Sequence, residues 1–128
     1  MQETRKAVYL AGGFRSGWQA RAVAVLNNYE LFDPSTHNLD DPKAFTEWDL
    51  NAVRRSDIVL ANMERTNPGG YALALEVGFA KALSKYIILV DQIEDPIVDR
   101  YFEMVRQVAD MVFEDLESAL TYLGRSDV

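Results

Sequence analysis

The amino-acid sequence predicts an α/β fold with a single doubly wound, five-stranded parallel sheet. Short apolar runs alternate along the chain with longer amphipathic stretches, which is the pattern of repeated βα units. Right-handed crossovers place helices on both faces of such a sheet. The 128 residues are 48% hydrophobic, which is enough for one core, and they contain no linker or internal repeat. We therefore expect one Rossmann/flavodoxin-like domain over residues 1–128.

The first βα unit begins close to the N-terminus. Ala7–Ala11 (AVYLA) predicts a buried strand, and a glycine-containing loop at 12–17 follows it. Helical spacing of apolar residues predicts a helix over Trp18–Asn28. Tyr29–Phe32 is a short second strand, which an Asp-Pro pair at 33 and 34 ends.

The middle of the chain adds two helices around a third strand. After a polar connection at 35–42, helical periodicity predicts a helix over Lys43–Arg55. Ile58–Ala61 (IVLA) is the third strand, and Tyr71–Leu83 is a strongly apolar helix.

The last third completes the sheet. Tyr86–Val90 (YIILV) is the fourth strand, and Pro96 opens a predicted helix through Arg106 because proline suits a first helical turn. Met111–Phe113 is a short fifth strand. A closing helix, Leu116–Leu123, is ended by a glycine.

Composition limits the chemistry that the chain can carry. It has no cysteine and one histidine, His37, which excludes thiol catalysis and metal sites that need two imidazoles. The net charge of −7 repels a polyanion, so we expect no polymeric nucleic acid as partner, whereas a small nucleotide needs only a local cluster of donors. No apolar run has the length of a signal-peptide core or a membrane span, so a cytoplasmic protein without membrane contact is expected.

Ligands of doubly wound sheets bind beyond the carboxyl ends of the strands, at the switch in strand order. We therefore expect the site at the loops after the first, third and fourth strands. The candidate binding residues in the loops after the first and third strands are Gly12, Gly13, Phe14, Arg15, Ser16, Gly17, Asn67, Gly69 and Gly70. The first loop offers backbone N–H groups, a hydroxyl and a guanidinium to an anion, although a tight turn with a solvated arginine explains it equally well.

Glu76 is the first candidate catalytic residue. Its neighbours three and four positions away on the helix are all apolar: Ala72, Leu73, Phe79 and Ala80. A carboxylate in this setting loses part of its hydration, which costs energy unless hydrogen bonds or a function compensate. A buried structural glutamate held by backbone donors is the alternative.

Asp49 is the second candidate, because it lies within the apolar stripe of the helix over 43–55. Burial there would raise its pKa and suit a general acid, while an acid that caps a neighbouring loop is the alternative. The Tyr9 hydroxyl is expected near the carboxyl end of the first strand, where a core tyrosine is the alternative. His37 lies in a polar loop and is expected to be solvated. The aromatic side chains that could stack on a base, or simply pack, are Phe14, Trp18 and Trp48.

Taken together, these positions resemble the nucleoside 2-deoxyribosyltransferase family over about residues 7–90. The resemblance rests on VYLAGGF at 8–14, EWDL at 47–50 before RRSDIVLA at 54–61, and GGYALALEVGFAKAL at 69–83 before KYIILV at 85–90. It implies that Glu76, in an E-x-G signature, attacks the anomeric carbon of deoxyribose. It further implies that Asp49 protonates the leaving base, that Tyr9 orients the glutamate, and that the chain forms a homodimer or larger homo-oligomer. The chemistry requires no metal or cofactor.

The chain departs from the family pattern in two places. Position 70 is glycine where many of the transferases have a second aspartate, and no C-terminal Asn-x-Met segment is present. The loop at 12–17 is more similar to related deoxynucleoside-monophosphate N-glycosidases, which hold a 5′-phosphate there and release the base to water. The predicted function is therefore cleavage of the N-glycosidic bond of a 2′-deoxyribonucleoside or its 5′-monophosphate, with a second base or water as acceptor.

Three alternative hypotheses account for parts of the same sequence pattern. A receiver-type signalling domain would need clustered acids after the first strand, where the chain has Gly12 and Gly13. A phosphoribohydrolase resembling the cytokinin-activating enzymes shares a Pro-Gly-Gly and a later glutamate, but the Gly-Thr pair of its motif is missing. A non-catalytic nucleotide-binding module remains open as long as the burial of Glu76 is only inferred.

Overall fold

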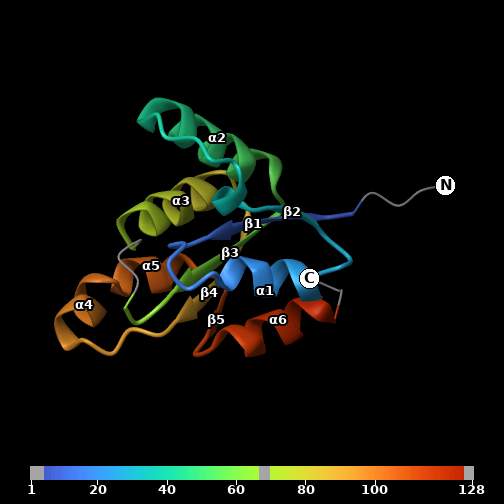
Figure 1. The fold of residues 1–128 in the computed structure, drawn as a ribbon. Coiled ribbons are helices and arrows are strands. Elements are labelled where there is room, and N and C mark those ends of the chain that lie inside the picture. Colours follow the sequence, from blue (N-terminus) through green and yellow to red (C-terminus); the bar gives the residue numbers. More distant parts are fainter. Residues whose placement is uncertain (1–4, 67–69, 126–128) are drawn as a thin grey trace.

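A parallel sheet of five strands in the order β2-β1-β3-β4-β5 forms the centre of the protein (Figure 1). The computed structural model describes residues 5–66 and 70–125. The strands are β1 Ala7–Ala11, β2 Glu30–Phe32, β3 Ile58–Met63, β4 Tyr86–Asp91 and β5 Met111–Phe113. Every neighbouring pair runs parallel, so the predicted doubly wound α/β fold is confirmed. The direction in which strands are added to the sheet reverses between β1 and β3, because β2 lies on one side of β1 and the chain then crosses to the other side to form β3.

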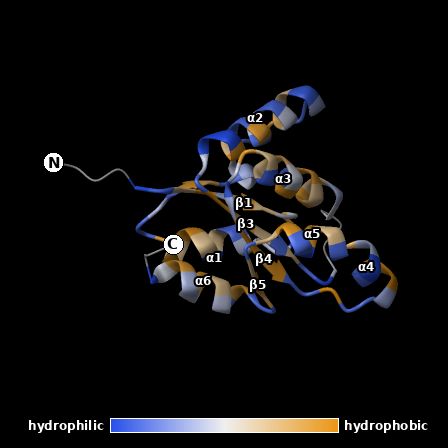
Figure 2. Cartoon of the chain, turned by 180° about the vertical axis from the view of Figure 1, so that it is seen from behind, coloured by the Kyte–Doolittle hydropathy of each residue, from blue (hydrophilic) through white to orange (hydrophobic). Residues whose placement is uncertain are grey.

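The helices cover both faces of the sheet (Figure 1). One face carries α1 (Trp18–Val25) and α6 (Leu116–Gly124), and the other carries α2 (Pro42–Arg55), α3 (Gly70–Ala82) and α5 (Glu103–Val108). The remaining elements are α4 (Pro96–Tyr101), which precedes α5, and a short 3₁₀ turn η1 (Pro34–Thr36). The strands of the sheet are largely hydrophobic, and the most hydrophilic segments lie on the helices and loops around it (Figure 2).

Strand alternation sends neighbouring side chains into two separate cores. In β1, Val8 and Leu10 pack beneath α1 and α6, whereas Tyr9 and Ala11 face α2 and α3. All four side chains are completely buried. A strand that is buried on both faces excludes charged and strongly polar side chains, because neither face is in contact with water. The sequence of the first strand is therefore an unbroken apolar run.

The predicted helix from Pro96 to Arg106 is wrong in one respect, because two helices replace it. Asp95 caps α4 by accepting hydrogen bonds from Ile97 N and Val98 N. The chain then turns at Phe102, which belongs to neither helix and is only 6% exposed. Burying this ring in the core beside α3 requires a change of direction that one straight helix over this stretch would not allow.

The other boundaries differ by a few residues. α1 ends at Val25 because Leu26 turns into the core, and the two asparagines that follow form a turn. β3 continues two residues beyond its predicted end, since Asn62 and Met63 pair with Val90 and Asp91. Within the described residues, no helix has the length and apolarity that crossing a bilayer requires.

Candidate active site

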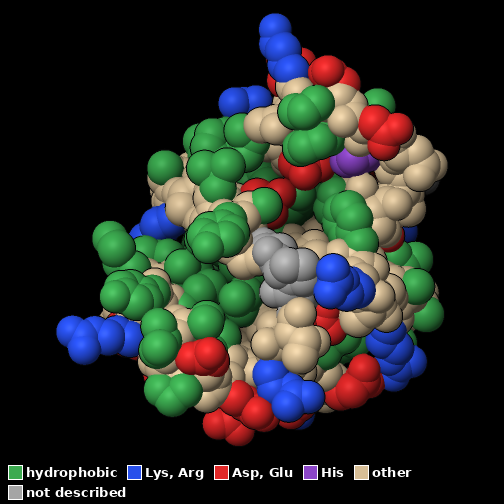
Figure 3. All heavy atoms as spheres, turned by 60° about the vertical axis from the view of Figure 1, so that its left-hand side comes forward, with side chains coloured by type: hydrophobic (Ala, Val, Ile, Leu, Met, Phe, Trp, Pro, Cys, Tyr) green, Lys and Arg blue, Asp and Glu red, His purple; other side chains and the backbone are tan. Residues whose placement is uncertain are grey.

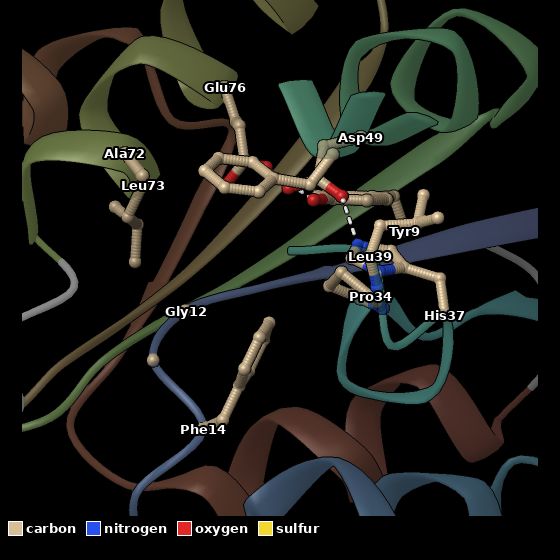
Figure 4. Close-up of a pocket in the computed structure, with 12 residues that line it drawn as sticks. Tyr9, Gly12, Phe14, Pro34, His37, Leu39, Asp49, Ala72, Leu73 and Glu76 are labelled. Atoms are coloured by element: carbon tan, nitrogen blue, oxygen red, sulfur yellow. Dashed lines mark hydrogen bonds and ion pairs between the residues drawn. The ribbon is translucent and has the colours of Figure 1, made fainter. Parts of the chain in front are cut away.

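A cavity of about 360 Å³ opens at the carboxyl end of β1, beside the switch in strand order. Its wall is formed by the end of β1, the loops after β1 and β2, and the facing sides of α2 and α3 (Figure 4). The lining residues are Tyr9, Gly12, Gly13, Phe14, Pro34, His37, Leu39, Phe45, Asp49, Ala72, Leu73 and Glu76. The three predicted catalytic residues therefore share one hollow, which is large enough for a nucleoside-sized ligand.

Glu76 enters this cavity from the second turn of α3. Its side chain is 5% exposed and accepts a hydrogen bond at Oε2 from the Tyr9 hydroxyl. Burial raises the pKa of Glu76 from 4.5 to about 7, and the nearby charge of Asp49 adds to the increase, while the Tyr9 hydrogen bond opposes it. At neutral pH the carboxyl group is thus divided between its charged and neutral forms.

Tyr9 is completely buried, and its place in β1 directs the phenol toward the α2 and α3 side of the sheet. Burial, followed by the charge of Glu76, raises the pKa of Tyr9 above its ordinary value. The hydroxyl therefore stays protonated and acts as a donor. One oxygen of Glu76 is held by this bond, which leaves the other available to the cavity.

Asp49 approaches the same cavity from α2 and pairs with His37 (Figure 4). His37 Nε2 lies 3.1 Å from Asp49 Oδ1, and His37 Nδ1 accepts a hydrogen bond of 3.0 Å from Leu39 N. Since Nδ1 is an acceptor, the ring proton sits on Nε2 and is donated to Asp49. Burial raises the pKa of Asp49, and the bond from His37 opposes this increase. A raised pKa favours the protonated form that a general acid needs.

The expected position of His37 in solvent was wrong. Its side chain is only 10% exposed, and its ring packs edge-to-face against Trp48 with the ring centres 4.8 Å apart. The loop after β2, which sequence reasoning did not assign to the site, contributes three cavity residues, Pro34, His37 and Leu39. It reaches the site because β2 lies beside β1 in the sheet. The loop after β4 contributes no lining residue among those described.

Only the first part of the predicted anion loop faces the cavity. Gly12, Gly13 and Phe14 line it, whereas Arg15, Ser16 and Gly17 do not. The Ser16 hydroxyl donates to Glu64 Oε1 at 2.8 Å. Gly12 has φ +144°, and a Cβ there would stand 2.8 Å from the Asn62 carbonyl oxygen, so the close approach of this loop to β3 requires glycine.

The second predicted binding segment is described only in part. Gly70 forms the first residue of α3 but borders a different hollow, together with Tyr71. Asn67 and Gly69 lie outside the described residues. Within the described ranges, no group of three or more potential ligand side chains is close enough to hold a metal ion.

Fold and site together define a class of protein: an α/β domain that presents two partly or fully buried carboxyl groups to a small-molecule cavity at the switch point of its sheet. The sequence model of the nucleoside 2-deoxyribosyltransferase family matches residues 8–122, so the chain belongs to this family, as its motifs predicted. The family is named for the transfer of the 2-deoxyribosyl group of nucleosides, which are small-molecule substrates.

Solved structures share the fold at low sequence identity. A 2-deoxyribosyltransferase from Leishmania mexicana superimposes with a TM-score of 0.74 at 17% identity, covering 96% of this chain and 99% of that one. The CMP N-glycosidase BcmB from Clostridium botulinum gives a TM-score of 0.60 at 20% identity, covering 92% and 98% of the two chains. No curated protein sequence gives a significant match.

Proposed function

We propose that this protein cleaves the N-glycosidic bond of 2′-deoxyribonucleosides or their 5′-monophosphates, with Glu76 as the nucleophile. The observation that carries the proposal is a carboxylate with 5% exposure that borders a cavity, is oriented by Tyr9, and shares that cavity with Asp49. A glutamate kept only for stability has no reason to face an open hollow, because burying its charge costs free energy.

In the first half-reaction, an oxygen of ionised Glu76 attacks C1′ of the sugar. The bond between C1′ and the base nitrogen breaks, and its electron pair leaves with the base, which receives a proton from Asp49. The product is an ester between Glu76 and deoxyribose. His37 holds one oxygen of Asp49 at 3.1 Å, which directs the second oxygen and its proton toward the base.

In the second half-reaction, a water molecule or the nitrogen of another base attacks C1′ and restores free Glu76. Asp49, now ionised, takes the proton from the attacking group, as microscopic reversibility requires. The same two carboxyl groups therefore serve hydrolysis and transfer. Which acceptor is used depends on what occupies the base side of the cavity after the first base departs.

The apolar side of the cavity suits a flat base. Pro34, Leu39 and Phe45 lie near Asp49 and His37, where a departing base would be protonated. Phe14 stands at the edge of the cavity and is 51% exposed, which leaves its ring face available to a ligand. Apolar side chains pack on the face of any base, so Pro34, Leu39 and Phe45 supply affinity more than discrimination between bases.

The proposal is tested by incubating the protein with deoxynucleosides and their 5′-monophosphates, with and without a second free base, and separating the products by chromatography. Free base formed without an acceptor identifies a hydrolase, and a new nucleoside formed only with an acceptor identifies a transferase. Mass spectrometry of the quenched reaction should find one deoxyribosyl group on the peptide that contains Glu76. Full turnover by Glu76→Ala would rule out this nucleophile.

The matched control for that variant is Glu47→Ala. Glu47 lies on the exposed side of α2, the helix that carries Asp49. This substitution removes the same group from the protein without touching the cavity. We expect full activity from Glu47→Ala and none from Glu76→Ala, with matching circular dichroism spectra for both variants.

We further propose that the protein forms a homodimer or larger homo-oligomer. Exposed hydrophobic side chains gather over α3, α4 and α5, on the left in Figure 3. They are Tyr71, Leu75, Ile97, Val98, Tyr101 and Met104, with exposed fractions from 42% to 94%. Exposed apolar side chains that gather on one face commonly mark a protein–protein contact. Light scattering during size-exclusion chromatography should give more than one chain, and Tyr101→Ser with Met104→Ser should give a monomer.

A further inference from the structure

Gln19 is a buried amide that the proposed mechanism does not use. It lies in the first turn of α1, is 1% exposed, and donates from Nε2 to Gly13 O at 3.1 Å and to Gly12 O at 3.4 Å. Its neighbour Trp18 donates from the indole Nε1 to Gly13 O at 3.0 Å. Turning the Gln19 amide over would set its oxygen against two carbonyl oxygens, so this orientation is the stable one.

These bonds fix the direction of two peptide groups. Both peptides are trans, so each N–H points opposite to its own C=O. The carbonyls of Gly12 and Gly13 point toward α1, and the N–H groups of Gly13 and Phe14 therefore point away from it. The cavity lies on that side of the loop, between the loop and helices α2 and α3 (Figure 4). Neither N–H has a hydrogen-bond partner among the described residues.

We infer that Gln19 is a positioning residue, which holds the Gly13 and Phe14 amides as a pair of donors for an oxygen of the substrate. The inference rests on the proposed function, since it assumes a nucleoside or nucleotide in the cavity. The base occupies the end near Asp49 and His37, so the loop faces the far end of the sugar. Two neutral donors there suit a 5′-hydroxyl or an oxygen of a 5′-phosphate.

The variant Gln19→Met tests this role because it keeps the side-chain length and removes both donors. The probes are 2-deoxyribose and 2-deoxyribose 5-phosphate, which carry no base and undergo no cleavage. We expect the Kd of one or both to rise roughly tenfold, the size expected for loosening a pair of neutral hydrogen bonds. For the full substrate, KM should rise while kcat stays within about twofold, because Gln19 touches no reacting atom.

The matched control is Gln107→Met. Gln107 is exposed on α5, and its Nε2 bonds to Glu103 Oε1 at 2.7 Å, away from the cavity. This variant should bind both sugars as the wild type does. A loss confined to the phosphorylated sugar assigns the amides to phosphate, and a loss for both sugars assigns them to the hydroxyl end. Unchanged Kd values in a folded Gln19→Met protein would overturn the inference.

If Gln19→Met does not fold, NMR spectroscopy of the wild-type protein tests the role of the two amides. The amide proton resonances of Gly13 and Phe14 should move downfield when whichever of the two sugars binds is added to the wild-type protein. Resonances that stay in place would refute the role of these donors. A wild type that binds neither sugar and cleaves no nucleoside contradicts the proposed function itself. Cleavage by the wild type together with an unaffected Gln19→Met variant contradicts only the inference about Gln19.

Discussion

The substitution Glu76→Gln should stabilise the folded protein at high pH while abolishing its activity. Glu76 is 5% exposed, and its folded-state pKa lies at about 7 instead of 4.5. A carboxyl group whose pKa is raised by folding makes its full contribution to stability at low pH and loses it as pH rises through the folded value. Ionisation of the buried group is therefore a cost to the wild type that the glutamine variant does not carry.

The magnitude follows from the change in pKa. An increase from 4.5 to about 7 corresponds to about 3 kcal/mol of unfolding free energy, at about 1.36 kcal/mol for each pH unit. Most of this loss falls between pH 5 and pH 8. In urea, whose effect on a small protein is about 1–3 kcal/mol per molar, the unfolding midpoints of variant and wild type should separate by about 1–3 M at pH 8.

Urea unfolding at pH 5 and pH 8 measures the effect. The difference between variant and wild type cancels the contributions of titrating groups that do not interact with position 76, so its change with pH reports on Glu76 and the groups in contact with it. Glu47→Gln on the exposed side of α2 is the control, and its difference from the wild type should not change with pH. If Glu76→Gln gave a pH-independent difference as well, the carboxyl group would not be buried as described, and the physical basis of the proposed nucleophile would be lost.

Four further substitutions have defined outcomes. Tyr9→Phe removes the bond that lowers the pKa of Glu76, so the acid limb of the kcat/KM profile should move to higher pH; an unmoved limb would contradict the bond. Asp49→Asn should reduce kcat by roughly 10²–10⁴, and by much less for a deoxyriboside whose leaving group needs no proton, as stopped assays on both substrates would show. His37→Phe removes a bond that lowers the pKa of Asp49, so the basic limb should shift upward, and a profile like that of the wild type would argue against the pairing. Gly12→Ala should cost roughly 1–3 kcal/mol in urea unfolding, because its φ is +144° and the new Cβ would meet the Asn62 carbonyl oxygen at 2.8 Å.

Local patterns were enough to predict the five strands of this fold. A strand buried on both faces must be apolar throughout, and for that reason AVYLA and YIILV are recognisable without tertiary information. Helix ends were less predictable, because burial decides them. Leu26 ends α1 and Phe102 separates α4 from α5, and each does so by turning a side chain into a core that exists only after folding.

The candidate site also contains residues that local sequence patterns identify and residues that only the structure places. Glu76 was identifiable from its apolar neighbours on one helix, since helical spacing is a local property. Its motif also carried the family resemblance, which the match over residues 8–122 confirms. The loop at 12–17 was located correctly, yet its sequence could not show that its first three residues line the cavity while Ser16 pairs with Glu64.

The sequence by itself determined which side chains prefer burial and where the chain turns, because both depend on residues within a few positions of one another. Only the tertiary structure decided which groups meet. The bond from Tyr9 to Glu76 joins positions 67 residues apart, and His37 reaches Asp49 because β2 lies beside β1. Such contacts depend on strand order and helix packing, which no local pattern encodes, and they set the pKa values on which the proposed chemistry depends.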